Sequence, residues 1–200
     1  MKKFRLICLS LLLSTFCLAQ QRHLSFMGIP INGTINSFET KLKAKGVIPD
    51  TELNRSLPYG ERMYNGTYIG RKCSIKVRYT AKTKTVYGIE IGFSDENQNR
   101  VNNFESDFVE GVKKKYKDSH MISEENSVSD KTIYVYNTKG FDNFSWENVI
   151  GILKTEWMTI IGRPKEGYSG LKEKIIRSVK IYYIDKLNTE LRDEENASDI

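Results

Sequence analysis

Few side chains in this 200-residue chain have the types and spacing that catalysis or metal binding requires. His23 and His120 are its two histidines, and Cys73 is the one cysteine after residue 17. A zinc site of ordinary composition uses several His or Cys ligands, and a serine-hydrolase triad uses a histidine as its base. His120 follows a predicted helix in a polar loop, which favours an exposed, passive side chain. We therefore expect no metal ion and no catalytic residue of these types.

Carboxylates are the remaining candidates for acid–base chemistry. Glu90, Glu147 and Glu156 lie on or beside predicted strands, and glycoside hydrolysis needs two carboxyl groups about 5–10 Å apart in a cleft. The alternation of Glu90 with Ile89 and Ile91 predicts a solvated position on a polar strand face. The glycines lie at or between predicted strands rather than before a helix, so we expect no phosphate-binding loop and no cofactor. A glycoside or cell-wall hydrolase with paired carboxylates stays the alternative to a non-enzyme.

Three tyrosines are candidates for binding a partner. Tyr134 and Tyr136 alternate with the apolar residues of their predicted strand, and Tyr182 directly precedes Tyr183 in another. Because neighbouring side chains of a strand point to opposite faces, some of these rings point away from a single core. Burial under a helix is one interpretation, and a sugar-binding or protein-binding face is the other. Tyr134, Tyr136 and Tyr182 are therefore the candidate partner-binding residues.

Strands must position these side chains, and their pattern is clearest between residues 62 and 93. Residues 73–80 and 87–93 alternate apolar and polar side chains, which is typical of half-buried strands, and the polar break at 81–85 lets them pair as a hairpin. Residues 63–69 form a third predicted strand. Cys73 falls on the apolar phase, so we expect a buried thiol rather than a reactive one.

Two predicted helices cover this sheet. One begins after Thr34, a good N-cap, and ends before Gly46; the other has apolar residues at helical spacing from 101 to 116. Further strands are predicted at 132–136 and 174–184, and the two apolar runs within 146–162 predict a hairpin. Residues 187–200 are acidic and predict a C-terminal helix or tail. The fold class is α+β, with antiparallel sheet covered by two main helices.

The segments organise into one exported domain. Residues 1–19 combine a basic start, an apolar run and small residues before a cleavage point, which predicts a secretory signal peptide and a periplasmic or secreted protein. Its removal lowers the formal charge from +6 by three, to +3, and we expect neither nucleic-acid binding nor membrane insertion afterwards. Residues 20–186 form the α+β domain. Similar spacing in 26–95 and 100–186 suggests a duplicated αβββ unit.

Residues 26–34, the short helix ending Lys43-Ala44-Lys45-Gly46 and the strand meander after it resemble a group of small exported bacterial proteins of unassigned activity. The order of helix and meander, with its suggested duplication, is similar to the β-lactamase-inhibitor-protein-like (BLIP-like) modules found in periplasmic and outer-membrane assembly proteins. These resemblances imply a fold and a compartment, and no catalytic motif. We expect a non-catalytic binding protein whose partner is an envelope protein or a glycan; a structural or assembly subunit of the envelope is a further alternative.

Overall fold

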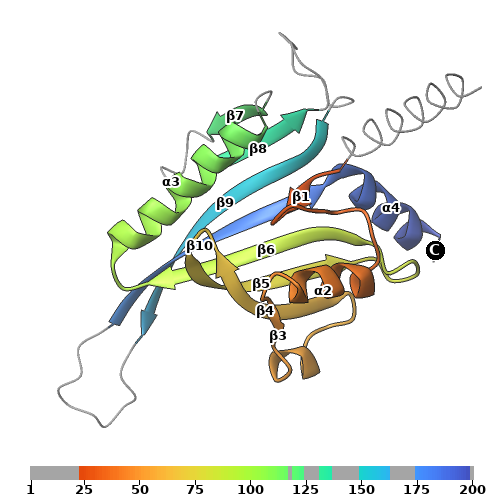
Figure 1. Ribbon diagram of the computed structural model, residues 1–200, viewed down its shortest axis with the longest axis horizontal. Coiled ribbons are helices and arrows are strands. Elements are labelled where there is room, and N and C mark those ends of the chain that lie inside the picture. Colours follow the sequence, from red (N-terminus) through yellow and green to blue (C-terminus); the bar gives the residue numbers. More distant parts are fainter. Residues whose placement is uncertain (1–22, 117–118, 124–130, 137–148, 163–173, 199–200) are drawn as a thin grey trace, which may run out of the picture.

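An antiparallel sheet dominates the computed structural model, which describes residues 23–116, 119–123, 131–136, 149–162 and 174–198. Within these ranges eight strands pair in the order β3-β4-β5-β6-β10-β9-β8-β7, and β1 and β2 form a separate hairpin (Figure 1). The strands are β1 (Ser25–Phe26), β2 (Ile29–Pro30), β3 (Ile48–Pro49), β4 (Glu61–Tyr68), β5 (Arg71–Tyr79), β6 (Val86–Asp95), β7 (Ser119–Ser123), β8 (Lys131–Tyr136), β9 (Val149–Gly162) and β10 (Lys174–Asp185).

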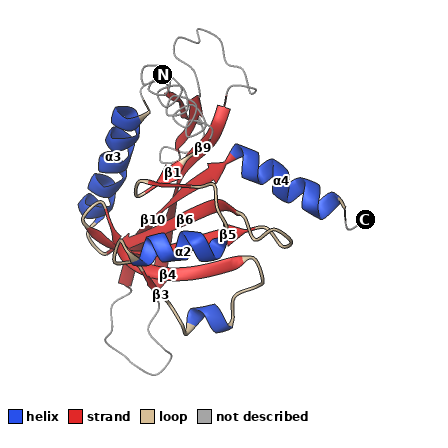
Figure 2. Ribbon diagram, turned by 45° about the vertical axis from the view of Figure 1, so that its right-hand side comes forward, coloured by secondary structure: helices blue, strands red, loops and turns tan. Residues whose placement is uncertain are grey.

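Helices α2 (Ile35–Lys43) and α3 (Gln98–Lys115) lie over one face of this sheet, and α4 (Lys186–Ala197) extends from its end (Figure 2). Helix α2 lies over the strands of the first half, and its predicted apolar face is buried. Helix α3 packs on β6 and β10. Helix α4 continues directly from β10, and a 3-10 helix, η2 (Leu53–Arg55), precedes β4. The α+β class and the helix-covered antiparallel sheet are therefore confirmed.

The sheet has the same order of elements in each half. Helix α2 precedes β3 to β6, and helix α3 precedes β7 to β10. The last strands of the two halves, β6 and β10, pair along eight positions at the centre of the sheet. Each half thus contains one strand more than the predicted unit, because the short strand after each helix, β3 or β7, joins at the outer edge. A common origin of the halves stays a prediction.

Two predictions about the second half are wrong. Residues 149–162 form one long strand, β9, rather than a hairpin, because β9 pairs with β10 on one side and with β8 on the other. Its polar break at 154–156 lies inside the strand, where the Thr155 hydroxyl faces the core and donates to Glu105 Oε1 at 2.7 Å. His120 lies in strand β7 rather than in a loop. The predicted strand residues 146–148 and the signal peptide lie outside the described residues.

The core fills the space between the sheet and its helices. Its fully buried side chains include Tyr64, Phe104, Ile91 and Ile181. Cys73 is 6% exposed, and burial raises the pKa of its thiol to about 11, so the predicted buried thiol is confirmed. The segment predicted as a C-terminal helix or tail forms α4 up to residue 197. In the described part of the chain, no helix has the length and apolar character needed to cross a membrane.

Candidate binding face

Helices α2 and α3 leave the opposite face of the sheet without a helix in the described ranges, and we call it the open face. In antiparallel pairs, directly opposed residues point to the same side. The register therefore sets three rows of side chains across this face. Each row is given in the order of the strands across the sheet. The first row is Ile48, Asn65, Ser74, Gly92, Lys180 and Glu156. The second row is Met63, Lys76, Glu90, Tyr182, Lys154 and Thr132, and the third is Glu61, Arg78, Gly88, Ile184, Ile152 and Tyr134.

Ion pairs connect the rows across strands β4, β5, β6 and β10. Arg78 bridges two strands, donating from Nη2 to Glu90 Oε2 at 2.6 Å and from Nε to Glu61 Oε1 at 3.1 Å. Lys180 Nζ lies 3.2 Å from Glu90 Oε1, and Lys76 Nζ lies 3.3 Å from Glu61 Oε2. The predicted solvated position of Glu90 is therefore wrong, since Glu90 is 8% exposed and held between two cations.

The surroundings of Glu90 fix its charge. Burial opposes ionisation of its carboxyl group, but the hydrogen bond and charge of Lys180, with the charges of Arg78 and Lys76, outweigh burial and lower its pKa. The guanidinium of Arg78 is also partly desolvated, and its bonds to Glu61 and Glu90 raise its pKa nevertheless. Both groups are charged near neutral pH. An ionised carboxylate cannot donate a proton, so Glu90 does not suit the role of a general acid.

Tyr182 lies beside this network, directly opposite Glu90. Its hydroxyl donates to Glu156 Oε2 at 2.7 Å, and its ring is half-buried. Burial and the nearby carboxylates of Glu156 and Glu90 raise the pKa of Tyr182 well above its ordinary value. Tyr134 is half-buried on the same face, one row away and two strands along the sheet. Tyr136 lies at the end of β8, and its side chain is outside the described structure.

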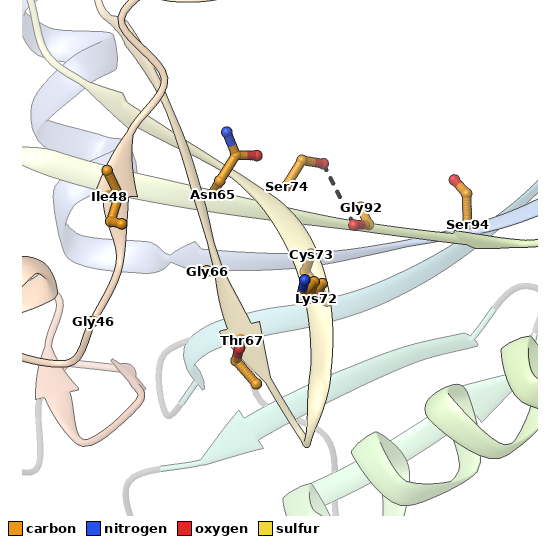
Figure 3. Close-up of a pocket in the computed structure, with 10 residues that line it drawn as sticks. All are labelled: Gly46, Ile48, Asn65, Gly66, Thr67, Lys72, Cys73, Ser74, Gly92 and Ser94. Atoms are coloured by element: carbon orange, nitrogen blue, oxygen red, sulfur yellow. Dashed lines mark hydrogen bonds between the residues drawn. The ribbon is translucent and has the colours of Figure 1, made fainter.

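A shallow cleft of about 600 Å³ lies at the β3 end of the open face (Figure 3). The polar side chains of Asn65, Ser74 and Ser94 point in the same direction in this view. Gly92 keeps the cleft floor low, because a Cβ there would lie 2.7 Å from Ser74 Oγ. Ile48, which is 68% exposed, lies at the edge of the cleft. The cleft therefore offers hydroxyl and amide groups beside one exposed apolar side chain.

Most of this face was not predictable from the sequence. The cations Lys76 and Arg78 alternate with apolar residues of β5, so a polar strand face was predictable, but their acidic partners come from other strands. Glu90 and Lys180 are 90 residues apart in the sequence. They meet diagonally because β6 pairs with β10, which places Glu90 opposite Tyr182 and Lys180 opposite Gly92. In the described chain, five carboxyl groups have a pKa that differs clearly from the ordinary value, and in each of them the pKa is lower. They are Glu39, Asp50, Glu90, Asp95 and Glu195.

The fold and this face define an α+β protein with a helix-covered antiparallel sheet and a polar, ion-paired open face. No known protein family matches the chain. No curated protein and no solved structure matches it either. No group of three or more His, Cys, Asp or Glu side chains that could hold a metal ion occurs among the residues described.

Proposed function

We propose that the chain is a non-catalytic binding protein whose open face engages a partner protein. The observation that carries the proposal is the ion-pair network of Glu61, Arg78, Glu90 and Lys180, which orders charges of both signs across four strands. Charges held in place before binding lose little conformational entropy when a partner docks. An alternating charge pattern selects a partner with the complementary pattern and fixes its orientation.

The residue types around the network also favour a protein partner. Arginine, tyrosine and methionine are enriched in protein interfaces, and Arg78, Tyr182 and Met158 occur on this face. Met158 is 42% exposed and lies opposite Ser178, which in turn pairs with Ser94 beside the cleft. Ile48 and Met158 thus present apolar groups on either side of the polar floor. Such groups can bury against a partner while the ion pairs set its position.

A glycan is the second candidate partner, and the cleft favours it. The side chains of Asn65, Ser74 and Ser94 supply donors and acceptors of the kind that bind sugar hydroxyls. A hydrolase has less support, because glycoside hydrolysis needs one carboxyl group with a raised pKa and the shifted carboxyl groups described above are lowered. Export to the periplasm or outside the cell, and kinship with BLIP-like modules, belong to the proposal.

Site-specific photo-crosslinking in the native cell tests the proposal. A photoreactive amino acid replaces Ser94 or Met158 on the open face, or Asn102 on the exposed side of α3 as the matched control. We expect one protein adduct of the same mass from both open-face positions and none from residue 102. A Lys180→Glu change, checked for unchanged thermal unfolding, should remove the adduct. Equal adducts from residue 102, or none from the open face, would contradict a protein partner.

A further inference from the structure

A second cavity of about 420 Å³ lies away from the open face, against helix α3. The β1–β2 turn, the β4–β5 turn and α3 enclose it, and its walls include Met27, Ile69, Phe108 and Val112. The hydroxyl-bearing rings of Tyr68 and Tyr183 also line it. The other side chains that line it are polar or charged: Ser25, Asp107, Lys115 and Tyr116. The cavity therefore combines an apolar surface with a set of polar groups, as small-molecule sites do.

Gly111 forms part of the helical wall of this cavity. Glycine is the least favourable residue after proline inside a helix, so a glycine in the interior of a helix calls for a packing or backbone explanation. Two common reasons do not apply to Gly111: its φ is not positive, and a Cβ placed on it would meet no atom within 4 Å. Gly111 lines the cavity, and a side chain added there would enter open space. Gly111 thus weakens α3 and enlarges the cavity.

Backbone strain also gathers at this cavity. Met27 has φ +50° and Ile69 has φ +48°, and they are two of the three non-glycine residues with positive φ in the described chain. Each begins a two-residue hairpin turn that glycine completes, a position that Asn, Asp or Gly fills more easily. A β-branched residue such as Ile69 is especially costly in this region. Both turns nevertheless carry large apolar side chains, and both line the same cavity.

The two phenols of the cavity supply a hydrogen-bond donor. Tyr68 Oη and Tyr183 Oη lie 2.6 Å apart and share one hydrogen bond. Two hydroxyl groups carry two protons, so one proton of the pair has no acceptor among the described residues. Burial raises the pKa of Tyr68 to about 12 and that of Tyr183 further, so both stay protonated at neutral pH. A ligand with an acceptor oxygen would complete this pair.

We propose that this cavity binds a compact apolar molecule that carries one hydrogen-bond acceptor, such as a carboxylate or a carbonyl. The apolar body contacts Met27, Ile69 and Phe108 and occupies the space beside Gly111. The acceptor takes the remaining proton of the Tyr68–Tyr183 pair. Lys115 and Asp107 also line the cavity, so it carries one charge of each sign, and the Lys115 ammonium donates to the Ser25 carbonyl. The site is separate from the open face and does not depend on the function proposed for it.

Methyl NMR with 2-naphthoate as the probe tests the site in the full mature chain, labelled on the methionine methyl groups. Met27 lines the cavity, whereas Met63 lies on the open face and serves as the internal reference. We expect 2-naphthoate to shift the Met27 signal saturably and to leave the Met63 signal in place. A Gly111→Leu change fills the cavity and should weaken binding about tenfold or more.

Stability separates cavity filling from misfolding in this experiment. Because leucine is a far better helix former than glycine, Gly111→Leu should raise the melting temperature by about 2–4 °C while it removes binding. Asn103→Ala, an exposed change on the same helix, improves the helix without touching the cavity and should bind 2-naphthoate as the natural chain does. No saturable shift at Met27, an equal shift at Met63, or unchanged affinity in Gly111→Leu would each overturn the proposal.

Discussion

Glu90 shows how a single charge is kept at the centre of a sheet. Its carboxylate is nearly inaccessible to water, and removing a charge from water is costly unless partners replace the lost hydrogen bonds. Arg78 and Lys180 supply those bonds from the strands on either side. The same arrangement means that the three residues depend on each other, because deleting one partner leaves a buried charge uncompensated.

We predict that Glu90→Gln lowers the free energy of unfolding by about 2 kcal/mol at pH 7, since the amide cannot balance two cations. The pKa of Glu90 is lower in the folded chain than its ordinary value of 4.5, so its stabilisation is complete above that value and is lost as the pH falls through the folded-state pKa. The difference in unfolding free energy between the variant and the natural chain should therefore shrink in urea titrations as the pH falls below 4.5. Glu52→Gln, on an exposed loop, is the control, and an equal loss there would contradict the prediction.

Helix α4 also holds a buried carboxylate through hydrogen bonds, in this case to elements far apart in the sequence. Glu195, near its end, accepts from the backbone amides of Lys82 and Thr83 at 2.8 and 3.2 Å and from the Thr83 hydroxyl at 2.6 Å. Burial opposes ionisation of Glu195, but these donors outweigh it and lower its pKa to about 2. At the other end of α4, buried Asp185 caps the helix through the amide of Asn188 and accepts from the amide of Leu24.

Removing the Glu195 contact should release the end of α4. We predict that Glu195→Ala lowers the free energy of unfolding by about 1–3 kcal/mol, because three donors in the β5–β6 turn lose their acceptor. Amide hydrogen exchange should accelerate at residues 82–83 and in the last turns of α4, and remain unchanged in α2. The stabilisation should persist down to about pH 4.5 and disappear toward pH 2. Glu194→Ala, at the exposed neighbouring position, should have little effect; equal effects would contradict this role.

Helices and strands were predictable from the sequence where the apolar side chains recur at the period of the element and are also the buried ones. Strands β5 and β6 alternate strictly, and α2 and α3 show apolar residues at helical spacing, so each was predicted in type and place. Strand β9 was misjudged because Thr155 is polar and faces the core, and Glu105 on α3 satisfies it there. The partners of Glu90, Asp185 and Glu195 come from other elements, and no local pattern reveals which strand edges will meet.

For the molecule as a whole, the pairing of β6 with β10 decides whether the halves act together. Ile91 and Ile181 face each other across this junction, and both are fully buried. Side chains from both halves therefore share one core rather than two. A shared core predicts cooperative unfolding of the whole chain.

We predict that Ile181→Ala lowers the free energy of unfolding by about 2–5 kcal/mol, through lost contacts and the cavity it leaves. Hydrogen exchange measured by mass spectrometry should then accelerate in peptides from both α2 and α3, although the change lies in the second half. Leu187→Ala, at an exposed position after the junction, is the control and should change neither the free energy of unfolding nor the exchange rates in α2 and α3. Faster exchange confined to α3 and its strands would indicate that the halves unfold independently.

The outermost strand beside α2 also bears on how copies of the chain behave at high concentration. Strand β3 is two residues long, and one of them is Pro49, which has no amide hydrogen. A strand this short offers an incoming chain little backbone to add to, and proline at a sheet margin is a known defence against edge-to-edge growth. At this margin the molecule is thus protected from stacking into fibres.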